Sequence, residues 1–390
     1  MARITTGNGA WAAWADAQSL RLAERAGEAE TLRSVPEATI REVEAAGYFA
    51  MMVPRDLGGG GASFTEFFDV SRRLAKGCTS SAWTLSFLAM HAWLLCKFEP
   101  ALQVELFADG KVPLAPAPLA PTGQAVKVDG GYRISGRWEW ATGVNHADWL
   151  MVHCMEEGGG PRFCVLPIGE AVVEDVWRTA GMVATGSNTV VVEDLFVPEH
   201  RTLSALLMKF ASPPGEALHP GATVNFPMSP ALAIVAATPA LGAAEGALET
   251  FTARMKAKVQ AYSGGVKAGD MPATHLRLGE ALATVRAARL IWDDAIARLE
   301  REGPLGNAMP VESLAHIRLA SADIVRLANL AINTMSAAAG ASSGFLTSPL
   351  QRQLRDVQMI RGHVIFDWDR ATQIGGKIAL GIDPSPADLL

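Results

Sequence analysis

The chain has 390 residues, a formal net charge of −6 and an apolar fraction of 49%. That length accommodates two or three packed units, and the apolar fraction is sufficient for a large core. The net negative charge, without any block of like charges, argues against nucleic acid or an anionic membrane as the partner.

The sequence carries no signal for export or membrane insertion. Its first residues lack a basic segment followed by an apolar one, and no uncharged run of about 18 apolar residues occurs. The four cysteines, which show no CxxC spacing, are Cys78, Cys96, Cys154 and Cys164. Isolated thiols in a chain of this length predict reduced cysteines and a cytoplasmic protein.

Residues 1–112 are predicted to form an N-terminal helical domain. From residue 17 onward, apolar residues recur at three- and four-residue intervals, which is typical of amphipathic helices. Ser63 and Glu66 have the spacing of a capping box, so a helix is expected to begin there. Residues 80–98 are apolar on nearly all sides, which predicts a buried helix.

Residues 113–215 are predicted to form a small β domain, of barrel or sandwich type. The helical period disappears there, and Val, Thr, Trp and Tyr alternate with polar residues. The DGG sequence at 129–131 lies between two alternating runs and predicts a hairpin. Farther along, the alternation places Trp138, Trp140 and Thr142 on one face of a predicted strand.

Residues 216–390 are predicted to form an antiparallel four-helix bundle, because long amphipathic patterns return with short loops between them. The segment RDVQMIRGHVIFDWD at 355–369 continues the helical pattern. His363 and Asp367 are therefore predicted to share one helix face, either as a surface ion pair or as an acid–base pair facing a pocket. The order of helices, strands and helices indicates an α+β protein without an internal repeat.

Three segments resemble the flavin-dependent monooxygenases that are built on the acyl-CoA dehydrogenase fold. They are GRWEWATGVNHADWLMV at 136–152, GMVATGSNTVVVEDLFVPEHR at 181–201 and SSGFLTSPLQRQLRDVQMIRGH at 342–363. The segments occur in the order of the family, and the similarity spans nearly the whole chain. The resemblance implies an N-terminal helical domain, a central β-barrel or sandwich and a C-terminal four-helix bundle.

The resemblance implies flavin contacts in the β domain. Trp140 would pack against the isoalloxazine ring, and Thr142, where the family usually has Ser, would place its hydroxyl at flavin N5. Ser187 would contact flavin or substrate, although a tight turn explains its loop equally well. Without the resemblance, a Trp-rich barrel core would account for the two tryptophans of this strand.

The resemblance implies further cofactor contacts in the bundle. Arg254 would lie near the flavin phosphate, which arginine binds bidentately. A glycine-rich stretch, which in the dehydrogenases often meets the cofactor across a subunit interface, supplies the other expected contacts: Gly340, Ser342, Ser343 and Gly344. The structural alternatives are a solvated arginine and a turn that ends a helix.

Two histidines are candidates for proton transfer. His363 matches the active-site histidine of the family, and an unperturbed histidine pKa near 6.5 suits proton transfer at neutral pH. His91 corresponds to a pocket histidine of several hydroxylases, whereas a core histidine is the alternative. Asp367 would orient the His363 ring or raise its basicity, unless it forms only a surface ion pair.

No metal or nicotinamide site is predicted. The eight histidines form no HxxxH or HExxH pattern, and no GxGxxG follows a predicted strand. The chain therefore has no recognisable means of reducing its own flavin. The resemblance implies that a separate NAD(P)H:flavin reductase supplies FMNH2 or FADH2 by diffusion.

The leading hypothesis is the oxygenase component of a two-component flavin monooxygenase. Reduced flavin would react with O2 at C4a to give a hydroperoxide in a dry pocket, and a small aromatic or phenolic substrate would be hydroxylated. An N- or S-oxygenase of the same fold, an acyl-CoA dehydrogenase with bound FAD and a flavin-free scaffold are the alternatives. Because bundles of this fold usually pair, a homotetramer is expected.

Overall fold

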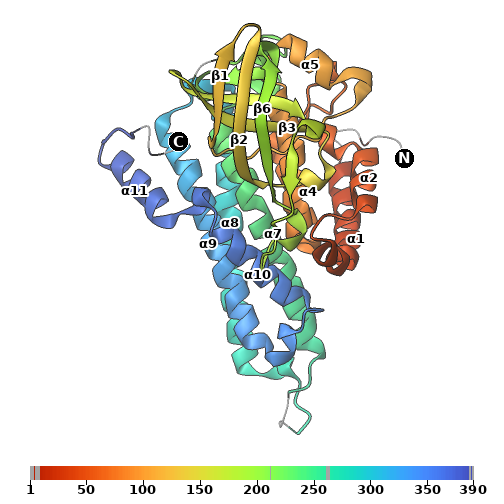
Figure 1. Ribbon diagram of the computed structural model, residues 1–390. Helices are drawn as coiled ribbons and strands as arrows, with labels where there is room; N and C mark the ends of the chain where they lie inside the picture. Colours follow the sequence, from red (N-terminus) through yellow and green to blue (C-terminus); the bar gives the residue numbers. More distant parts are fainter. Residues whose placement is uncertain (1–3, 5–8, 211, 261–263, 386–387, 389–390) are drawn as a thin grey trace.

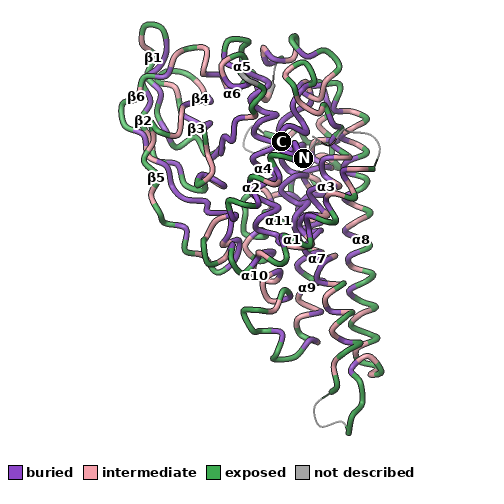
Figure 2. Tube along the Cα trace, turned by 90° about the vertical axis from the view of Figure 1, so that its right-hand side faces the viewer, coloured by how far each residue is buried: buried purple, intermediate pink, exposed green. Residues whose placement is uncertain are grey.

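The computed structural model describes residues 4, 9–210, 212–260, 264–385 and 388. Helices occupy both ends of the chain and strands its middle, so the predicted order of helices, strands and helices is confirmed (Figure 1). Figure 2 shows the strands on one side of the molecule and α8 on the other, with α4 and α7 between them.

The described residues before position 112 include five α-helices: α1 (Ala10–Leu32), α2 (Glu37–Ala46), α3 (Phe64–Gly77), α4 (Thr79–Leu95) and α5 (Pro100–Leu106). The predicted N-cap of α3 is confirmed, because Ser63 Oγ accepts a hydrogen bond of 3.2 Å from the Glu66 N–H. Nearly every residue of α4 is buried, as its continuous apolar sequence predicts.

The β domain consists of one sheet, with the described strands in the order β5-β6-β2-β1-β3-β4-β7. The strands are β1 (Gly123–Val128), β2 (Gly131–Ala141), β3 (Trp149–Glu156), β4 (Pro161–Pro167), β5 (Val172–Glu174), β6 (Asn188–Pro198) and β7 (Thr202–Ser204). The predicted hairpin is confirmed by antiparallel pairing of Val128 with Gly131. The sheet has its own core, whereas the helices at both ends of the chain share a second one.

The C-terminal part contains α6 (Ala205–Phe210), α7 (Met228–Ala257), α8 (Pro272–Glu302), α9 (Val311–Ala339), α10 (Pro349–Arg361) and α11 (Trp368–Ala379). Helices α7, α8 and α9 extend well beyond the β domain (Figure 1). Among the described residues, α7 alone has the length and hydropathy of a membrane span, but 89% of its most apolar window is buried inside the protein. It packs against α3, α4, α8, α9 and α10, and is therefore the central helix of the helical core.

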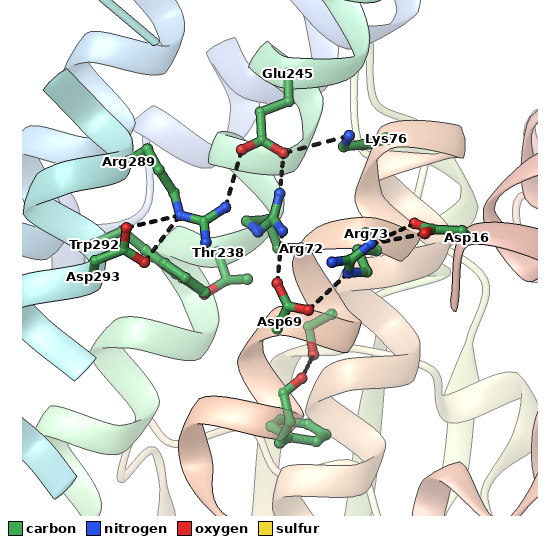
Figure 3. A network of polar contacts seen from close by, with 12 residues as sticks. Asp16, Asp69, Arg72, Arg73, Lys76, Thr238, Glu245, Arg289, Trp292 and Asp293 are labelled. Atoms are coloured by element: carbon green, nitrogen blue, oxygen red, sulfur yellow. Dashed lines mark hydrogen bonds and ion pairs between the residues drawn. The ribbon is translucent and has the colours of Figure 1, made fainter. Parts of the chain in front are cut away.

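The interface between α3 and α7 depends on a close backbone approach. A Cβ atom at Gly242 of α7 would lie 2.2 Å from the carbonyl oxygen of Arg72 in α3, so any larger residue would push the helices apart. One turn later on α7, Glu245 contacts three cations from two other helices: Arg72, Lys76 and Arg289 (Figure 3). This charge cluster connects the N-terminal helices to the C-terminal ones.

Candidate active site

Trp140 departs from the regular geometry of β2. Its φ is 68°, which is rare for a bulky residue, and the register between β2 and β6 shifts between Trp138 and Ala141. The bulge turns Trp140 outward, so that it is 55% exposed, whereas Trp138 is 1% exposed. The prediction that both side chains share one strand face is wrong. Trp140 meets Trp177 edge to face at a centroid distance of 5.1 Å and keeps its remaining surface open.

Three hydroxyl groups form a row beside this bulge. Thr142 Oγ1 lies 2.9 Å from Ser187 Oγ, which lies 2.8 Å from Thr185 Oγ1. Ser187 and Thr185 are buried, whereas Thr142 is half-buried and is the member open to a ligand. The Gly143 N–H donates to the Thr185 carbonyl at 2.9 Å. Two of the three sequence motifs, the end of β2 and the loop before β6, therefore meet here.

The loop at 181–187 is fixed by α10 and α4. Asp356 of α10 is buried and accepts hydrogen bonds from the Met182 N–H at 2.6 Å and from Ser80 Oγ at 2.9 Å. Burial raises the pKa of Asp356 to about 6. Gly181 lies so close to α10 that a Cβ would be 2.1 Å from a backbone carbonyl oxygen. Asp356 lies in the motif at 342–363 but is not among the predicted site residues, because its main-chain partner leaves no signature in the sequence.

Aromatic side chains form a row along α4. The ring centroids of Trp83 and Phe87 are 4.7 Å apart, those of Phe87 and His91 are 5.6 Å apart, and those of Trp83 and His363 are 6.1 Å apart. The two predicted histidines therefore lie at opposite ends of a Trp–Phe pair, and neither aromatic residue of that pair is among the predicted site residues. Helix α4 also packs against Gly143, next to the hydroxyl row.

His363 lies just beyond α10 and is exposed in the single chain. α10 ends at Arg361, and His363 begins a 3₁₀ turn in which its Nδ1 accepts a hydrogen bond of 3.2 Å from the Ile365 N–H. The prediction of one helix over 355–369 is therefore wrong. The surrounding protein, and secondarily the charge of Arg318, lower the pKa of His363 to about 4. A neutral ring whose Nδ1 accepts must carry its proton on Nε2.

Asp367 begins the next helix and does not orient His363. Its Oδ1 accepts a hydrogen bond of 3.0 Å from the Arg370 N–H, which makes it the N-cap of α11. In the part of the chain that the structure describes, no hydrogen bond joins Asp367 to His363. Burial and Arg370 lower the pKa of Arg318 to about 10, and the Asp367 charge opposes that shift. Because Arg318 donates to the Val364 carbonyl at 3.1 Å, Asp367 supports the turn that follows His363.

His91 is enclosed by the helical core and is 2% exposed. Burial lowers the pKa of its ring to about 4, and a backbone hydrogen bond at Ala115 opposes the shift. Its Nδ1 has no hydrogen-bond partner among the described residues. An unsatisfied buried polar atom costs about 1–3 kcal/mol, which is often tolerated where a ligand completes the bond.

The glycine-rich stretch and Arg254 meet at the far end of the bundle. The Arg254 guanidinium donates to Ser342 Oγ, and Lys258, one turn later, donates to the Ala339 carbonyl at 3.0 Å. Gly340, with φ of 81°, ends α9, and the Ser343 N–H donates to its carbonyl at 2.9 Å. A cavity of about 410 Å³ borders this turn and α10. The stretch thus forms a helix-ending turn and also borders a cavity. Lys258, which holds the end of α9, is not among the predicted site residues.

The predicted cofactor residues therefore fall into two groups. The β-domain group comprises Trp140, Thr142 and Ser187, and the bundle-end group comprises Arg254, Gly340, Ser342, Ser343 and Gly344. Helix α10 touches both, since Leu354 borders the cavity and Asp356 anchors the loop before β6. No hydrogen bond joins the two groups within the described ranges. In the part of the chain that the structure describes, no cluster of three or more His, Cys, Asp or Glu could hold a metal ion.

Comparison with known proteins identifies the family to which this architecture belongs. Residues 13–100 match the acyl-CoA dehydrogenase N-terminal domain, and residues 234–368 match the acyl-CoA dehydrogenase C-terminal domain. A pigment production hydroxylase of Rhodococcus sp. (strain ATCC 21145) is 34% identical over 368 residues, which are 93% of this chain and 94% of the relative. HsaA of Mycobacterium tuberculosis (strain ATCC 25618 / H37Rv), the oxygenase subunit of a flavin-dependent monooxygenase, is 32% identical over 93% of both chains. The chain belongs to the flavin-dependent monooxygenases of the acyl-CoA dehydrogenase fold.

Further similar proteins match this chain over nearly its whole length. The oxygenase component of the FADH2-dependent resorcinol hydroxylase of Rhizobium sp. (strain MTP-10005) is 30% identical over 92% of this chain and 90% of its own. The 3-HSA hydroxylase of Rhodococcus sp. RHA1 superposes with a TM-score of 0.89 at 30% identity, covering 96% of this chain and 97% of that one. XiaF from Streptomyces sp., solved with FADH2, gives a TM-score of 0.87 at 27% identity, covering 95% and 96%.

These likenesses confirm the predicted fold, the monooxygenase class and the use of reduced flavin with O2. The alternatives of an acyl-CoA dehydrogenase and a flavin-free scaffold lose their support, since the relatives named here are hydroxylases and monooxygenases over nearly their full length. The four cysteines are free and buried, as expected for isolated thiols.

Proposed function

We propose that this monooxygenase is an oxygenase component that hydroxylates a small aromatic or phenolic substrate, using O2 and FMNH2 or FADH2 from a separate NAD(P)H:flavin reductase. The observation that carries the substrate class is the aromatic row of α4, in which Trp83 and Phe87 lie between His91 and His363. Flat apolar rings complement an aromatic substrate, and the two neutral imidazoles supply polar contacts for a ring hydroxyl.

The β-domain group fits an isoalloxazine ring. Trp140 offers an exposed flat surface, and the half-buried Thr142 hydroxyl ends a row of buried hydroxyls. When bound, reduced flavin would supply the electrons that activate O2. The chain's own residues would orient the ring through Trp140, hold N5 through Thr142 and exclude water through the apolar residues of α4.

We assign different roles to the two histidines. His363 carries its proton on Nε2 and would donate a hydrogen bond to the substrate oxygen, which stabilises negative charge on a phenolic oxygen. His91 has an unpartnered Nδ1 and would accept the hydrogen of a substrate hydroxyl at the other end of the aromatic row. Asp367 would act indirectly, through Arg318 and the turn after His363.

The bundle-end group fits an anionic group such as a flavin phosphate. Arg254 lies in the last turn of α7 and Lys258 directly follows the helix, and both donate hydrogen bonds to the glycine- and serine-rich segment that borders the cavity. Because one chain leaves this group apart from Thr142, we propose that a second copy supplies it within a homotetramer. Large apolar side chains exposed near this end support assembly: Leu330, Phe345 and Leu346. The free, buried cysteines support a cytoplasmic location.

The function is tested by a single turnover without the reductase. The enzyme is mixed anaerobically with chemically reduced FMN or FAD, then with ¹⁸O2 and a panel of phenols, aromatic amines and sulfides. The expected result is one ¹⁸O atom in a hydroxylated phenol. Oxygen transfer only to nitrogen or sulfur would favour the N- or S-oxygenase, and transfer to no compound with either flavin would contradict the proposal.

A further inference from the structure

The hydroxyl row beside the β2 bulge has a fixed direction. Thr185 Oγ1 lies 2.9 Å from the Met182 carbonyl oxygen as well as 2.8 Å from Ser187 Oγ. A carbonyl oxygen only accepts, so the single hydroxyl proton of Thr185 points to Met182. Ser187 must then donate to Thr185, and Thr142 must donate to Ser187.

Reversing the row leaves a buried contact without a proton. If Thr185 donated to Ser187, its oxygen would face the Met182 carbonyl at 2.9 Å with no hydrogen between them. Thr185 and Ser187 are 2% and 4% exposed, so water does not readily compensate for the lost bond. The direction that satisfies every buried group therefore leaves Thr142 with its lone pairs facing the open side.

The Met182 carbonyl, which accepts the hydrogen bond from the last hydroxyl of the row, is itself held in place. Met182 has a φ of 53°, and its N–H donates to Asp356 at 2.6 Å. Its carbonyl also accepts a hydrogen bond of 3.0 Å from Trp177 Nε1, the indole that packs against Trp140. The Met182 carbonyl, which sets the direction of the row, is thus held by Asp356 of α10 and by Trp177, the residue that packs against Trp140.

We propose that Ser187 and Thr185 are positioning residues that orient the Thr142 hydroxyl as a hydrogen-bond acceptor and so select reduced over oxidised flavin. Reduced flavin carries a hydrogen on N5 and donates there, whereas oxidised flavin has a lone pair on N5 and needs a donor. An acceptor at N5 matches the first form and repels the second. The inference rests on the proposed placement of Thr142 at N5, and it replaces direct flavin contact by Ser187 with an indirect role.

Selection between the redox forms is measured by binding, independently of turnover. Dissociation constants for oxidised flavin in air and for reduced flavin under anaerobic conditions are determined with the purified full-length chain. Thr185→Val and Ser187→Ala remove the partners that fix the Thr142 proton, so Thr142 becomes free to donate. The ratio of the dissociation constant of oxidised flavin to that of reduced flavin is expected to fall about tenfold, as for one hydrogen bond. For a two-electron couple, that change lowers the midpoint potential of the bound flavin by about 30 mV.

Matched variants separate orientation from packing. Thr185→Ser keeps the hydroxyl and is expected to retain the wild-type ratio. Thr189→Val alters a buried threonine of the same β6 region, outside the hydroxyl row, and is also expected to retain it. A wild-type ratio in folded Thr185→Val and Ser187→Ala would overturn the inference alone. Absence of flavin binding by the wild-type chain in both redox states would overturn the proposed function as well.

Discussion

His91 and His363 lie at opposite ends of the Trp83–Phe87 pair and have complementary hydrogen-bonding states. The Nδ1 of His363 is occupied by a backbone N–H, which leaves Nε2–H as a donor. The Nδ1 of His91 has no partner among the described residues, which leaves an acceptor. The pKa of each ring is lowered to about 4, by burial for His91 and by the surrounding protein and the Arg318 charge for His363, so each is neutral at the pH where the enzyme would work.

Replacing His363 is expected to impair product formation more than flavin binding. His363→Ala should lower the single-turnover rate of hydroxylation by about 10²–10⁴-fold, because a positioned proton donor is lost. Because the pKa of His363 is about 4, its protonation should not produce an acid limb near neutral pH. Rates are measured from about pH 5 to about pH 9. The control is His316→Ala, which removes an exposed histidine paired with Asp294. Equal rates in both variants would contradict a role for His363.

His91 should make the protein sensitive to acid. Its pKa is 6.5 in the unfolded chain and about 4 when folded, so the unfolded state takes up a proton first as the pH falls below 6.5. Relative to its value above about pH 7, the free energy of unfolding is lower by about 2 kcal/mol at about pH 5 and by about 3 kcal/mol at or below about pH 4. His91→Phe should lose correspondingly less stability than wild type between about pH 7 and about pH 5 in urea unfolding. His275→Ala, at an exposed site, should follow wild type; a parallel curve for His91→Phe would contradict the prediction.

Elements could be predicted from the sequence where one pattern decides them, and not where local side-chain caps interrupt a continuous apolar period. The buried helix α4 and the hairpin before β2 follow from composition and turn chemistry alone. The apolar period of α10, by contrast, continues past Arg361 although the helix ends there, because His363 bonds to its own turn and Asp367 caps a new helix. Period alone cannot reveal such a break.

The candidate site shows the same division. The alternation along β2 predicts Trp138 and Trp140 on one face, but a bulge against β6 sends the second one outward. The hydroxyl row needs Thr142 and Ser187, which lie 45 positions apart in the chain, so its partners appear only in the fold. Asp356 acts on a backbone N–H, for which no residue type in the sequence is diagnostic.

The contact between α3 and α7 should depend strongly on Glu245. Its side chain is 14% exposed and contacts three cations, so Glu245→Gln leaves positive charges close together with little solvent. The expected loss is about 2–4 kcal/mol of stability. Glu249→Gln removes an ion pair of Lys76 with a carboxylate that is 65% exposed, and should cost at most about 1 kcal/mol. Thermal denaturation of both variants checks the difference; equal shifts in Tm would show that the buried cluster adds nothing.

At the scale of the whole molecule, the two groups of proposed cofactor residues raise the question of which chain completes a site. Thr142 lies at the β domain, whereas Arg254 lies beside Ser342 at the far end of the bundle. A phosphate-bearing flavin held at Thr142 of one copy would be reached by Arg254 of another if the bundles pair. Sites shared between copies and sites confined to one chain respond differently when two defective chains are mixed.

Mixed oligomers of two variants distinguish these arrangements. Thr142→Val and Arg254→Met chains with different affinity tags are co-expressed, and oligomers that carry both tags are purified. If sites are shared, a pair of unlike chains contains one intact site and one with both substitutions, so up to half of the sites should bind reduced FMN tightly. If each site lies within one chain, every site retains one defect, and the mixture should bind no better than either parent. The stoichiometry of anaerobic FMN binding decides, with the two separate homo-oligomers as controls.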